Sequence, residues 1–113
     1  MDDISEFKRL AVLKLNHVLQ VHNGSLESKG IPQQFELMII TSFGHIEGEY
    51  FEEDNGDLGL GILSNAITMT KHENPPVILL KNAKITPYGH KSPVHLIEQM
   101  TIFTDQIVGL SFK

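Results

Sequence analysis

The tail of the chain, residues 101–112, constrains the fold more than any other stretch. Residues 101–103 and 107–112 are two short runs rich in β-branched and aromatic side chains, the composition that favours strands. The polar residues 104–106 between them are too few for a helix, so the tail predicts two strands joined by a tight turn. Together with a strand pattern at 35–51, it predicts a mainly β fold: a small, bent antiparallel barrel preceded by one helix.

The size and charge of the chain limit the classes of protein it can belong to. Its 113 residues suffice for one domain, 1–113, with a helix in 1–24 and the barrel in 35–113. The hydrophobic share of 41% and charged share of 20% are typical of globular proteins rather than disordered ones. A net charge of −5 argues against broad, sequence-blind binding to a phosphate backbone, which depends on many Lys and Arg contacts.

The cellular setting follows from residues that are scarce or absent in the sequence. There are no cysteines, which excludes disulfides, cysteine-based zinc sites and thiol nucleophiles. The longest apolar runs, 10–13 and 77–80, are too short to cross a bilayer. The acidic N-terminus, with Asp2, Asp3 and Glu6, is unlike a signal peptide. We therefore expect a cytoplasmic protein that does not associate with membranes.

Residues 3–22 have the pattern of an amphipathic helix. Asp3 and Glu6 form a start resembling a capping box, and Asn23 with Gly24 predicts the end of the helix. The apolar stripe is wider than one neighbour would cover, which predicts packing across the open side of a sheet, with a second subunit able to cover the surplus. The residues at helical spacing are Ile4, Phe7, Ala11, Leu15, Val18 and Leu19.

The strand pattern starts after a polar connector at 25–34. Residues 35–42 and 45–51 read as two strands joined by a turn at 42–44. In the second strand, Ile46 and Tyr50 should point inward, while His45, Glu47 and Glu49 form a solvated face. Gly48 then lies on the inner face, where the lack of a side chain permits sharp bending. An acidic loop is expected at 52–57.

Residues 58–71 can be read in two ways. Leu58, Leu60 and Ile62 alternate with glycines as in a strand, whereas residues 63–67 would suit a short helix. We favour a strand here because of the glycines and the threonines at 68 and 70. A break at 72–76 precedes a buried strand at 77–85, a loop at 87–93 and a strand at 94–103.

Three stretches are similar to the motifs of a known family. In the first, a strand at 37–41 turns at Gly44, bends at Gly48 and reaches Asp54. In the second, residues 77–83 resemble the third strand that closes this motif. In the third, residues 102–108 resemble a β-turn-β element. In this arrangement the chain resembles the Sm-like family of small β-barrels.

The resemblance implies a bent barrel of the Sm/SH3-like type, whose tail strands pair between neighbouring subunits to build a ring. It also implies RNA binding, with Asp105 in the turn that lines the nucleotide pocket. The chain departs from the family at three places. Gly44 and Gly48 are one residue closer together than the two glycines of the family. Phe103 and Thr104 stand where the family has a basic residue and a glycine, and about twenty extra residues separate Asp54 from the third strand.

A basic cluster with an aromatic residue offers a nucleic-acid site. Small barrels hold single strands by combining cations with stacking side chains. The candidates are Lys81, Lys84, Tyr88 and Lys91, with His90 nearby and Asp105 added by the resemblance. The acidic total and the lack of tryptophan weigh against this hypothesis.

The six histidines raise the alternative of a small metal-dependent enzyme. His17 and His22 are five residues apart on the predicted helix, whereas residues three or four apart share a face. His45, His90 and His95 would have to be brought together by folding, and no recognised ligand spacing links them. No serine lies in a nucleophile-elbow context. We therefore predict no catalytic residue, no metal site and no cofactor.

The sequence best fits a non-enzymatic cytoplasmic interaction or assembly module, with regulation as one use of it. We expect it to form homo-oligomers through its tail, with a protein partner or RNA as further ligands. An Sm-like RNA-binding ring and the small metal-dependent enzyme remain the alternatives. The predicted oligomer interface consists of Thr101, Phe103, Ile107, Leu110 and Phe112.

Overall fold

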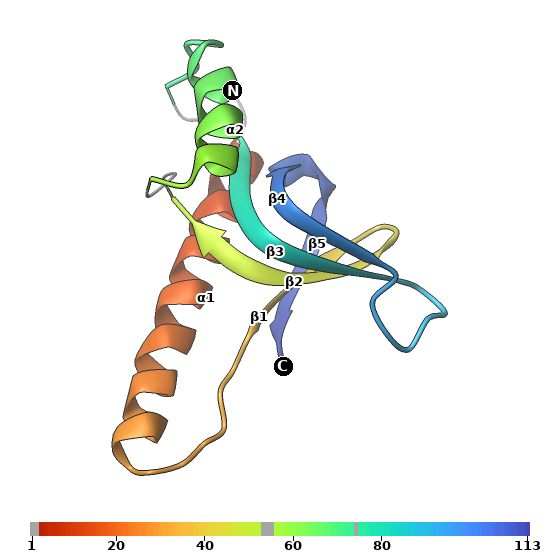
Figure 1. Cartoon of the computed structure of the whole chain (residues 1–113). Helices are drawn as coiled ribbons and strands as arrows, with labels where there is room; N and C mark the ends of the chain where they lie inside the picture. The colour runs from red at the N-terminus through yellow and green to blue at the C-terminus, as the bar shows by residue number, and fades with distance from the viewer. Residues whose placement is uncertain (1–2, 53–55, 74) are drawn as a thin grey trace.

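The computed structural model describes residues 3–52, 56–73 and 75–113 (Figure 1). Helix and strand occur in about equal amounts, so the chain is a mixed α/β protein, and the expectation of a mainly β fold underestimated its helix content. In chain order the elements are α1 (Asp3–Ser28), β1 (Leu37–Thr41), β2 (Gly44–Phe51), α2 (Leu58–Thr68), β3 (Val77–Pro87), β4 (His95–Phe103), the 3₁₀ turn η1 (Thr104–Gln106) and β5 (Ile107–Phe112).

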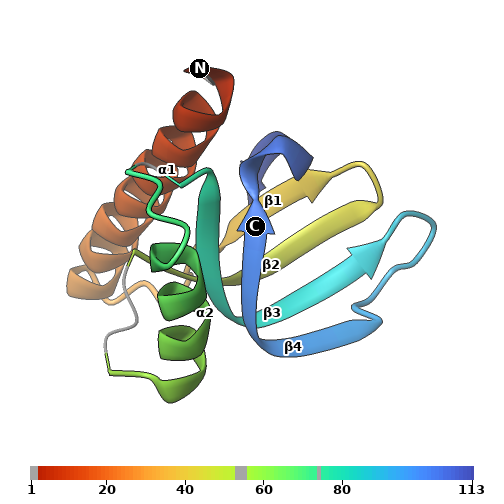
Figure 2. The ribbon, with the colours of Figure 1, turned by 90° about the horizontal axis from the view of Figure 1, so that it is seen from above.

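The five strands form one antiparallel sheet in the order β4-β3-β2-β1-β5. This confirms the expected N-terminal helix followed by an antiparallel sheet. The sheet is strongly curved, because β3 and β4 bend along their length (Figure 2). Among the described residues no ladder joins β4 to β5, so the sheet is open and the predicted closed barrel is not confirmed.

The curvature is associated with an irregularity between β2 and β3. The register of the two strands shifts between Glu47 and Glu49, opposite Asn82, whose φ of 55° is left-handed. A Cβ atom on Gly48 would lie 3.3 Å from both the Ala83 Cα and the Lys81 carbonyl oxygen. The backbones of β2 and β3 therefore approach each other closely at Gly48, the glycine at which the sequence predicts a bend.

The main hydrophobic core lies between α1 and the sheet. Ile46 is buried as predicted, and Tyr50 is half-buried against the same core. Full burial of one large aliphatic side chain stabilises a fold by about 1.5–3 kcal/mol, so this cluster fixes α1 on the sheet. Its buried members are Val12, Leu19, Leu37, Ile39, Ile46, Ile78, Leu80, Ala83, Ile85, Ile102 and Ile107.

The helix α1 is longer than predicted, since it continues past Gly24 to Ser28. Asn23 does not end the helix, because its amide is used elsewhere. Its Nδ2 donates to the Phe35 carbonyl oxygen (2.9 Å), and its Oδ1 accepts from the Phe35 backbone N–H (2.7 Å). The chain leaves the helix at Gly30, whose φ of 75° is the left-handed conformation common after a helix C-terminus.

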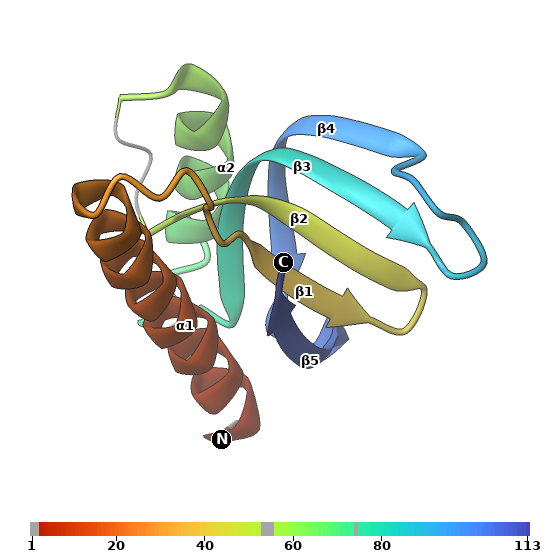
Figure 3. The ribbon, with the colours of Figure 1, turned by 90° about the horizontal axis from the view of Figure 1, so that it is seen from below.

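The strand predicted over 58–71 is wrong, because residues 58–68 form α2. Asp57 caps this helix, with its Oδ1 accepting from the Leu60 N–H at 2.9 Å. Leu60 is fully buried, whereas Leu58 and Ile62 are 88% and 71% exposed. These three residues therefore do not share one face, as they would in a strand. The extra residues relative to the Sm-like pattern therefore supply a second helix beside the sheet (Figure 3).

Some predictions fall on residues outside the described ranges. These are Asp54 of the first motif and residues 53–55 of the acidic loop, and the side chain of Asp3, predicted as part of a capping box, is not described either. Within the described part of the chain, neither helix is long and apolar enough to cross a membrane.

Candidate functional site

The sheet has two free edges, formed by β4 and β5 and connected by η1. The sequence of β5, IVGLSF, contains no charged residue, and β4 contains only Glu98. Natural proteins usually protect edge strands with lysines, prolines or bulges, because unpaired backbone groups recruit other strands. β5 has no lysine or proline, but its register against β1 shifts at Val108. Residues 109–112 beyond this irregularity have the composition of a strand that pairs.

Hydrogen bonding to β1 shows which backbone groups of β5 face the free side. Glu36 and Lys113 exchange two backbone hydrogen bonds, of 2.9 and 3.0 Å. In an antiparallel ladder such pairs alternate with non-bonded ones, and the register places Leu110 opposite Ile39 and Phe112 opposite Leu37. The N–H groups of Leu110 and Phe112 therefore point away from β1.

The five predicted interface residues occupy different environments. Ile107 is buried in the core, and Leu110 is half-buried against it. Phe103 and Phe112 are exposed, although the Phe112 ring makes an edge-to-face contact with Phe35, with ring centroids 5.4 Å apart. Thr101 is half-buried in β4, opposite Leu79.

Sequence reasoning missed Val108, which is 65% exposed on β5. Successive side chains of a strand point to opposite faces, so the exposure of Val108 could have been predicted from the burial of its neighbour Ile107.

An apolar groove of about 440 Å³ adjoins this edge strand. One wall is the N-terminal half of α1, where Ile4 and Phe7 are both exposed, and the other wall is residues 107–110 of β5. Part of the surplus of the α1 apolar stripe, Ile4 and Phe7, therefore lies beside the β5 edge, whereas exposed Val18 lies farther along the helix. Lys8 is the charged residue of its lining.

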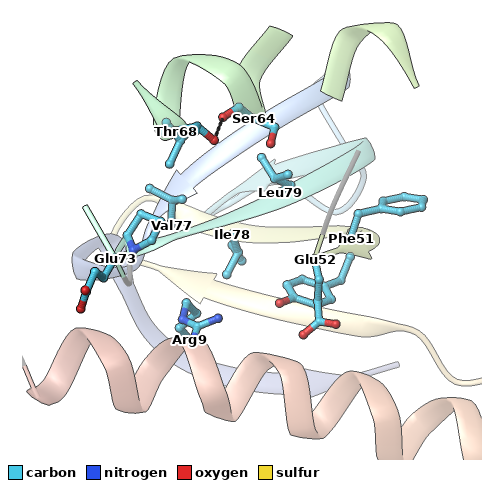
Figure 4. Close-up of a pocket in the computed structure, with 12 residues that line it drawn as sticks. Arg9, Phe51, Glu52, Ser64, Thr68, Glu73, Val77, Ile78 and Leu79 are labelled. Carbon is cyan, nitrogen blue, oxygen red and sulfur yellow. Dashed lines mark hydrogen bonds between the residues drawn. The ribbon is translucent and has the colours of Figure 1, made fainter. Parts of the chain in front are cut away.

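A second cavity, of about 240 Å³, lies between α1, α2 and the adjoining ends of β2 and β3 (Figure 4). Arg9 enters it from α1, but its guanidinium is bonded to Glu6 at 3.0 and 3.3 Å, which raises the pKa of Arg9. Burial raises the pKa of Tyr50, and the negative charge of Glu52 adds to this effect. The cavity is lined by charged side chains of both signs and by apolar residues, as is common where secondary-structure elements pack together. Its volume is also smaller than that of ordinary ligand pockets.

The predicted nucleic-acid residues do not converge on one surface. Lys81 is half-buried and forms an ion pair with Asp57, which raises the pKa of Lys81 and lowers that of Asp57. This lysine thus attaches the start of α2 to β3. Tyr88 is exposed just beyond the other end of β3, and its hydroxyl donates to the Thr41 carbonyl oxygen at 2.7 Å.

The remaining three candidates are also separated from one another. Lys84 is exposed in the middle of β3, opposite Glu47, and Lys91 is exposed in the loop between β3 and β4. Asp105 is exposed in η1, next to the Phe103 that pairs with Val77 at the start of β3. Asp105 and Tyr88 therefore lie near opposite ends of an 11-residue strand.

The histidines are spread over the surface of the chain. His17, His22, His90 and His95 are exposed, and His45 is half-buried with its Nε2 3.7 Å from Glu47 Oε1. In residues 3–52, 56–73 and 75–113, no group of three His, Asp or Glu side chains is placed to hold a metal ion.

The predicted solvated face of β2 is wrong at Glu47, which is only 5% exposed. β2 is the central strand, and its neighbours Met38 and Lys84 stand opposite Glu47 on the same face. The Lys113 ammonium donates to Glu47 Oε1 at 3.1 Å, so the buried carboxylate has a cationic partner. The alternation of residues along one strand does not show that long side chains on the neighbouring strands will bury Glu47.

No family model, no curated protein and no solved structure matches this chain. The resemblance to the Sm-like family therefore stays a prediction, and the function has to be inferred from the chain's own geometry.

Proposed function

We propose that the protein is a non-enzymatic, cytoplasmic assembly module in which β4 of one copy pairs with β5 of the next. The observation that carries this proposal is the charge-free edge of β5 lying beside the apolar groove of α1. An added strand would satisfy the outward N–H groups of β5 and cover Ile4, Phe7 and Val108. Both needs are met by one partner, which favours strand addition over a compact ligand.

A second copy is the partner that the edges themselves support. Each copy offers one β4 edge and one β5 edge, so the contact is head-to-tail and repeats. Such contacts build a ring when the rotation between copies closes. The strong curvature of the sheet favours a closed ring over an extended fibre, since each added copy would continue the bend. This is the Sm-like barrel and ring arrangement, proposed here as the assembled state.

The RNA-binding alternative has less support than assembly. Its cationic candidates are divided between an ion pair within the chain, the middle of β3 and the distal loop. The hypothesis of a metal-dependent enzyme has even less support, because the histidines lie on separate parts of the surface. Neither alternative accounts for the uncharged edge.

The mass of the protein in solution tests the proposal. We expect light scattering to give a multiple of the 12.7 kDa chain mass. Val108→Lys places a charge on the edge and should reduce the mass to that of a smaller species. Val21→Lys makes the same change at an exposed valine on the C-terminal half of α1 and should leave the mass unchanged. A wild-type monomer at high concentration, or an unchanged mass for Val108→Lys, would contradict the proposal.

A further inference from the structure

Phe103 is a large apolar side chain that the fold of a single chain leaves on the surface. It is the last residue of β4, is 57% exposed, and stands opposite Val77 at the start of β3. Two residues later, Asp105 is exposed in η1. Among the described residues, its carboxylate has only the amide of neighbouring Gln106 as a partner, at 3.4 Å. The segment 103–105 therefore presents an aromatic ring followed by a negative charge without a cationic partner.

The apolar groove beside β5 has the complementary features. It is called the α1–β5 groove below, and it is lined by Ile4, Phe7, Lys8, Ala11 and residues 107–110 (Figure 3). Phe7 is 70% exposed on its helical wall. In the described part of the chain, no acidic side chain forms an ion pair with Lys8. The groove is therefore complementary to an apolar side chain that is followed by an acid.

The backbone of β4 shows that Phe103 faces the free edge of the sheet. The Thr104 N–H donates to the Pro76 carbonyl oxygen at 2.8 Å, so Thr104 is bonded on the β3 side. Bonded and non-bonded positions alternate along an antiparallel ladder, so the N–H groups of Thr101 and Phe103 point away from β3. These groups are therefore free to bond with the outward-facing positions of β5 in the next copy.

The direction of β4 decides on which face of a paired sheet Phe103 lies. Within one copy, Ile102 is in the core opposite Ile78, so Phe103 beside it points to the face away from the core. Four antiparallel ladders separate β4 from β5, so the two strands run in the same direction. An antiparallel junction with β5 therefore turns the neighbouring β4 over. Its Phe103 then points to the same side as Leu110, toward the α1–β5 groove.

Two registers pair both outward positions of β5 with residues on this face of β4. In one, Leu110 and Phe112 lie opposite Phe103 and Thr101 of the neighbouring copy. In the other, each lies opposite the residue two positions earlier on β4. In both registers Phe103 lies beside residues 108–110, which line the groove. The position of Phe103 therefore does not depend on which register forms.

We propose that Phe103 of one copy fills the α1–β5 groove of the next, and that Asp105 pairs there with Lys8. The proposal rests on the proposed function, because it needs the β4 edge of one copy on the β5 edge of another. An aromatic side chain seated in a pocket commonly dominates the affinity of an interface. Charge complementarity adds specificity. An arbitrary apolar segment would fill the groove but would leave Lys8 without an acid.

A single tryptophan tests this contact, because the chain has none. The fluorescence of Phe103→Trp should shift to shorter wavelength in the concentrated, assembled protein, since the groove removes the ring from water. It should return to longer wavelength on dilution or when Val108→Lys is added. Leu96→Trp, at a 76% exposed position of β4 that lies beyond Phe112 in both registers, should show no shift. Light scattering on the same samples measures the edge pairing independently.

Substitutions measure how much Phe103 contributes. Phe103→Ser should raise the concentration needed for assembly by about tenfold or more. Leu96→Ser removes a similar apolar side chain from the same strand and should leave that concentration unchanged. Circular dichroism checks that each variant is folded, as expected for exposed positions. Equal effects of the two changes would overturn the role of Phe103.

A charge exchange tests the pairing of Asp105 with Lys8. Lys8→Glu and Asp105→Lys should each weaken assembly by about threefold, and the double variant should regain most of the loss. Lys14→Glu makes the same change at an exposed position farther along α1 and should have no effect. A double variant that assembles no better than the single ones would overturn this ion pair.

The failures of the two proposals are distinguishable. If the protein assembles but Phe103→Trp shows no spectral shift, the Phe103 contact is overturned and the edge pairing stands. If Phe7→Trp shifts on assembly while Phe103→Trp does not, another segment fills the groove and the contact is again overturned. If the larger indole prevents assembly, the result for Phe103→Ser decides. A wild-type protein that stays monomeric at high concentration overturns both proposals.

Discussion

The attachment of α1 to the chain entering the sheet depends strongly on Asn23, and its removal has a calculable cost. The amide makes two hydrogen bonds with the Phe35 backbone, of 2.9 and 2.7 Å, in a half-buried position. One such bond contributes about 1 kcal/mol net, and an unpaired half-buried backbone group costs a similar amount. We therefore expect Asn23→Ala to reduce the free energy of unfolding by about 2 kcal/mol.

This loss is measurable in a melting experiment. For a domain of this size, 1 kcal/mol shifts Tm by about 4 °C, so Asn23→Ala should melt about 8 °C below the wild type. Urea unfolding followed by circular dichroism gives the free energy itself. Gln20→Ala, at an exposed position one turn earlier on the same helix, should change the stability by less than about 0.5 kcal/mol. If Asn23→Ala lowers the free energy of unfolding by less than about 0.5 kcal/mol, the hydrogen bonds of Asn23 do not attach α1 to the chain entering the sheet, and the reasoning is refuted.

Two further predictions concern the ends of the helices. Gly24→Ala should stabilise the fold by about 0.5–1 kcal/mol, because Gly24 lies inside α1 with open space around it, whereas Gly30→Ala should destabilise it by about 1 kcal/mol because of its positive φ. Chemical denaturation checks both, and the same sign for the two changes would contradict the observed end of α1. The pKa of Asp57 is lowered by Lys81, so its charge stabilises the folded state above the ordinary carboxyl range and this contribution is lost as the pH falls through the folded pKa. Asp57→Asn keeps a capping side chain without the charge, so its stability deficit at neutral pH should vanish in acid; a deficit independent of pH would show that the ion pair adds nothing.

The tail and the central strands could be predicted from sequence because their signals are local. The interruption at residues 104–106 is too short for anything except a turn, and it forms η1. The burial of Ile46 follows from the alternation of side chains along a strand, and the register irregularity between β2 and β3 falls at Gly48, where the sequence predicts a bend. In these places propensity, alternation and packing agree.

The rest depended on contacts between distant residues. The glycines at 59 and 61 suggested a strand, but the Asp57 cap and the close packing of Gly59 on Gln99 favour a helix. Asn23 would end an isolated helix, yet its amide binds Phe35, twelve residues later. Among the candidate site residues, Lys81 was predicted to bind nucleic acid, but it forms an ion pair with Asp57, which lies 24 residues away in sequence. No local pattern contains this information.

Amide hydrogen exchange on β5 tests the proposed edge pairing most directly. The N–H groups of Ser111 and Gly109 face β1 and should be protected at every protein concentration. Those of Leu110 and Phe112 face the free edge, so they should be protected only in the concentrated, assembled protein and should exchange rapidly on dilution or in Val108→Lys. Rapid exchange of Leu110 and Phe112 at all concentrations would show that nothing pairs with the edge of β5, and the proposed assembly would be wrong.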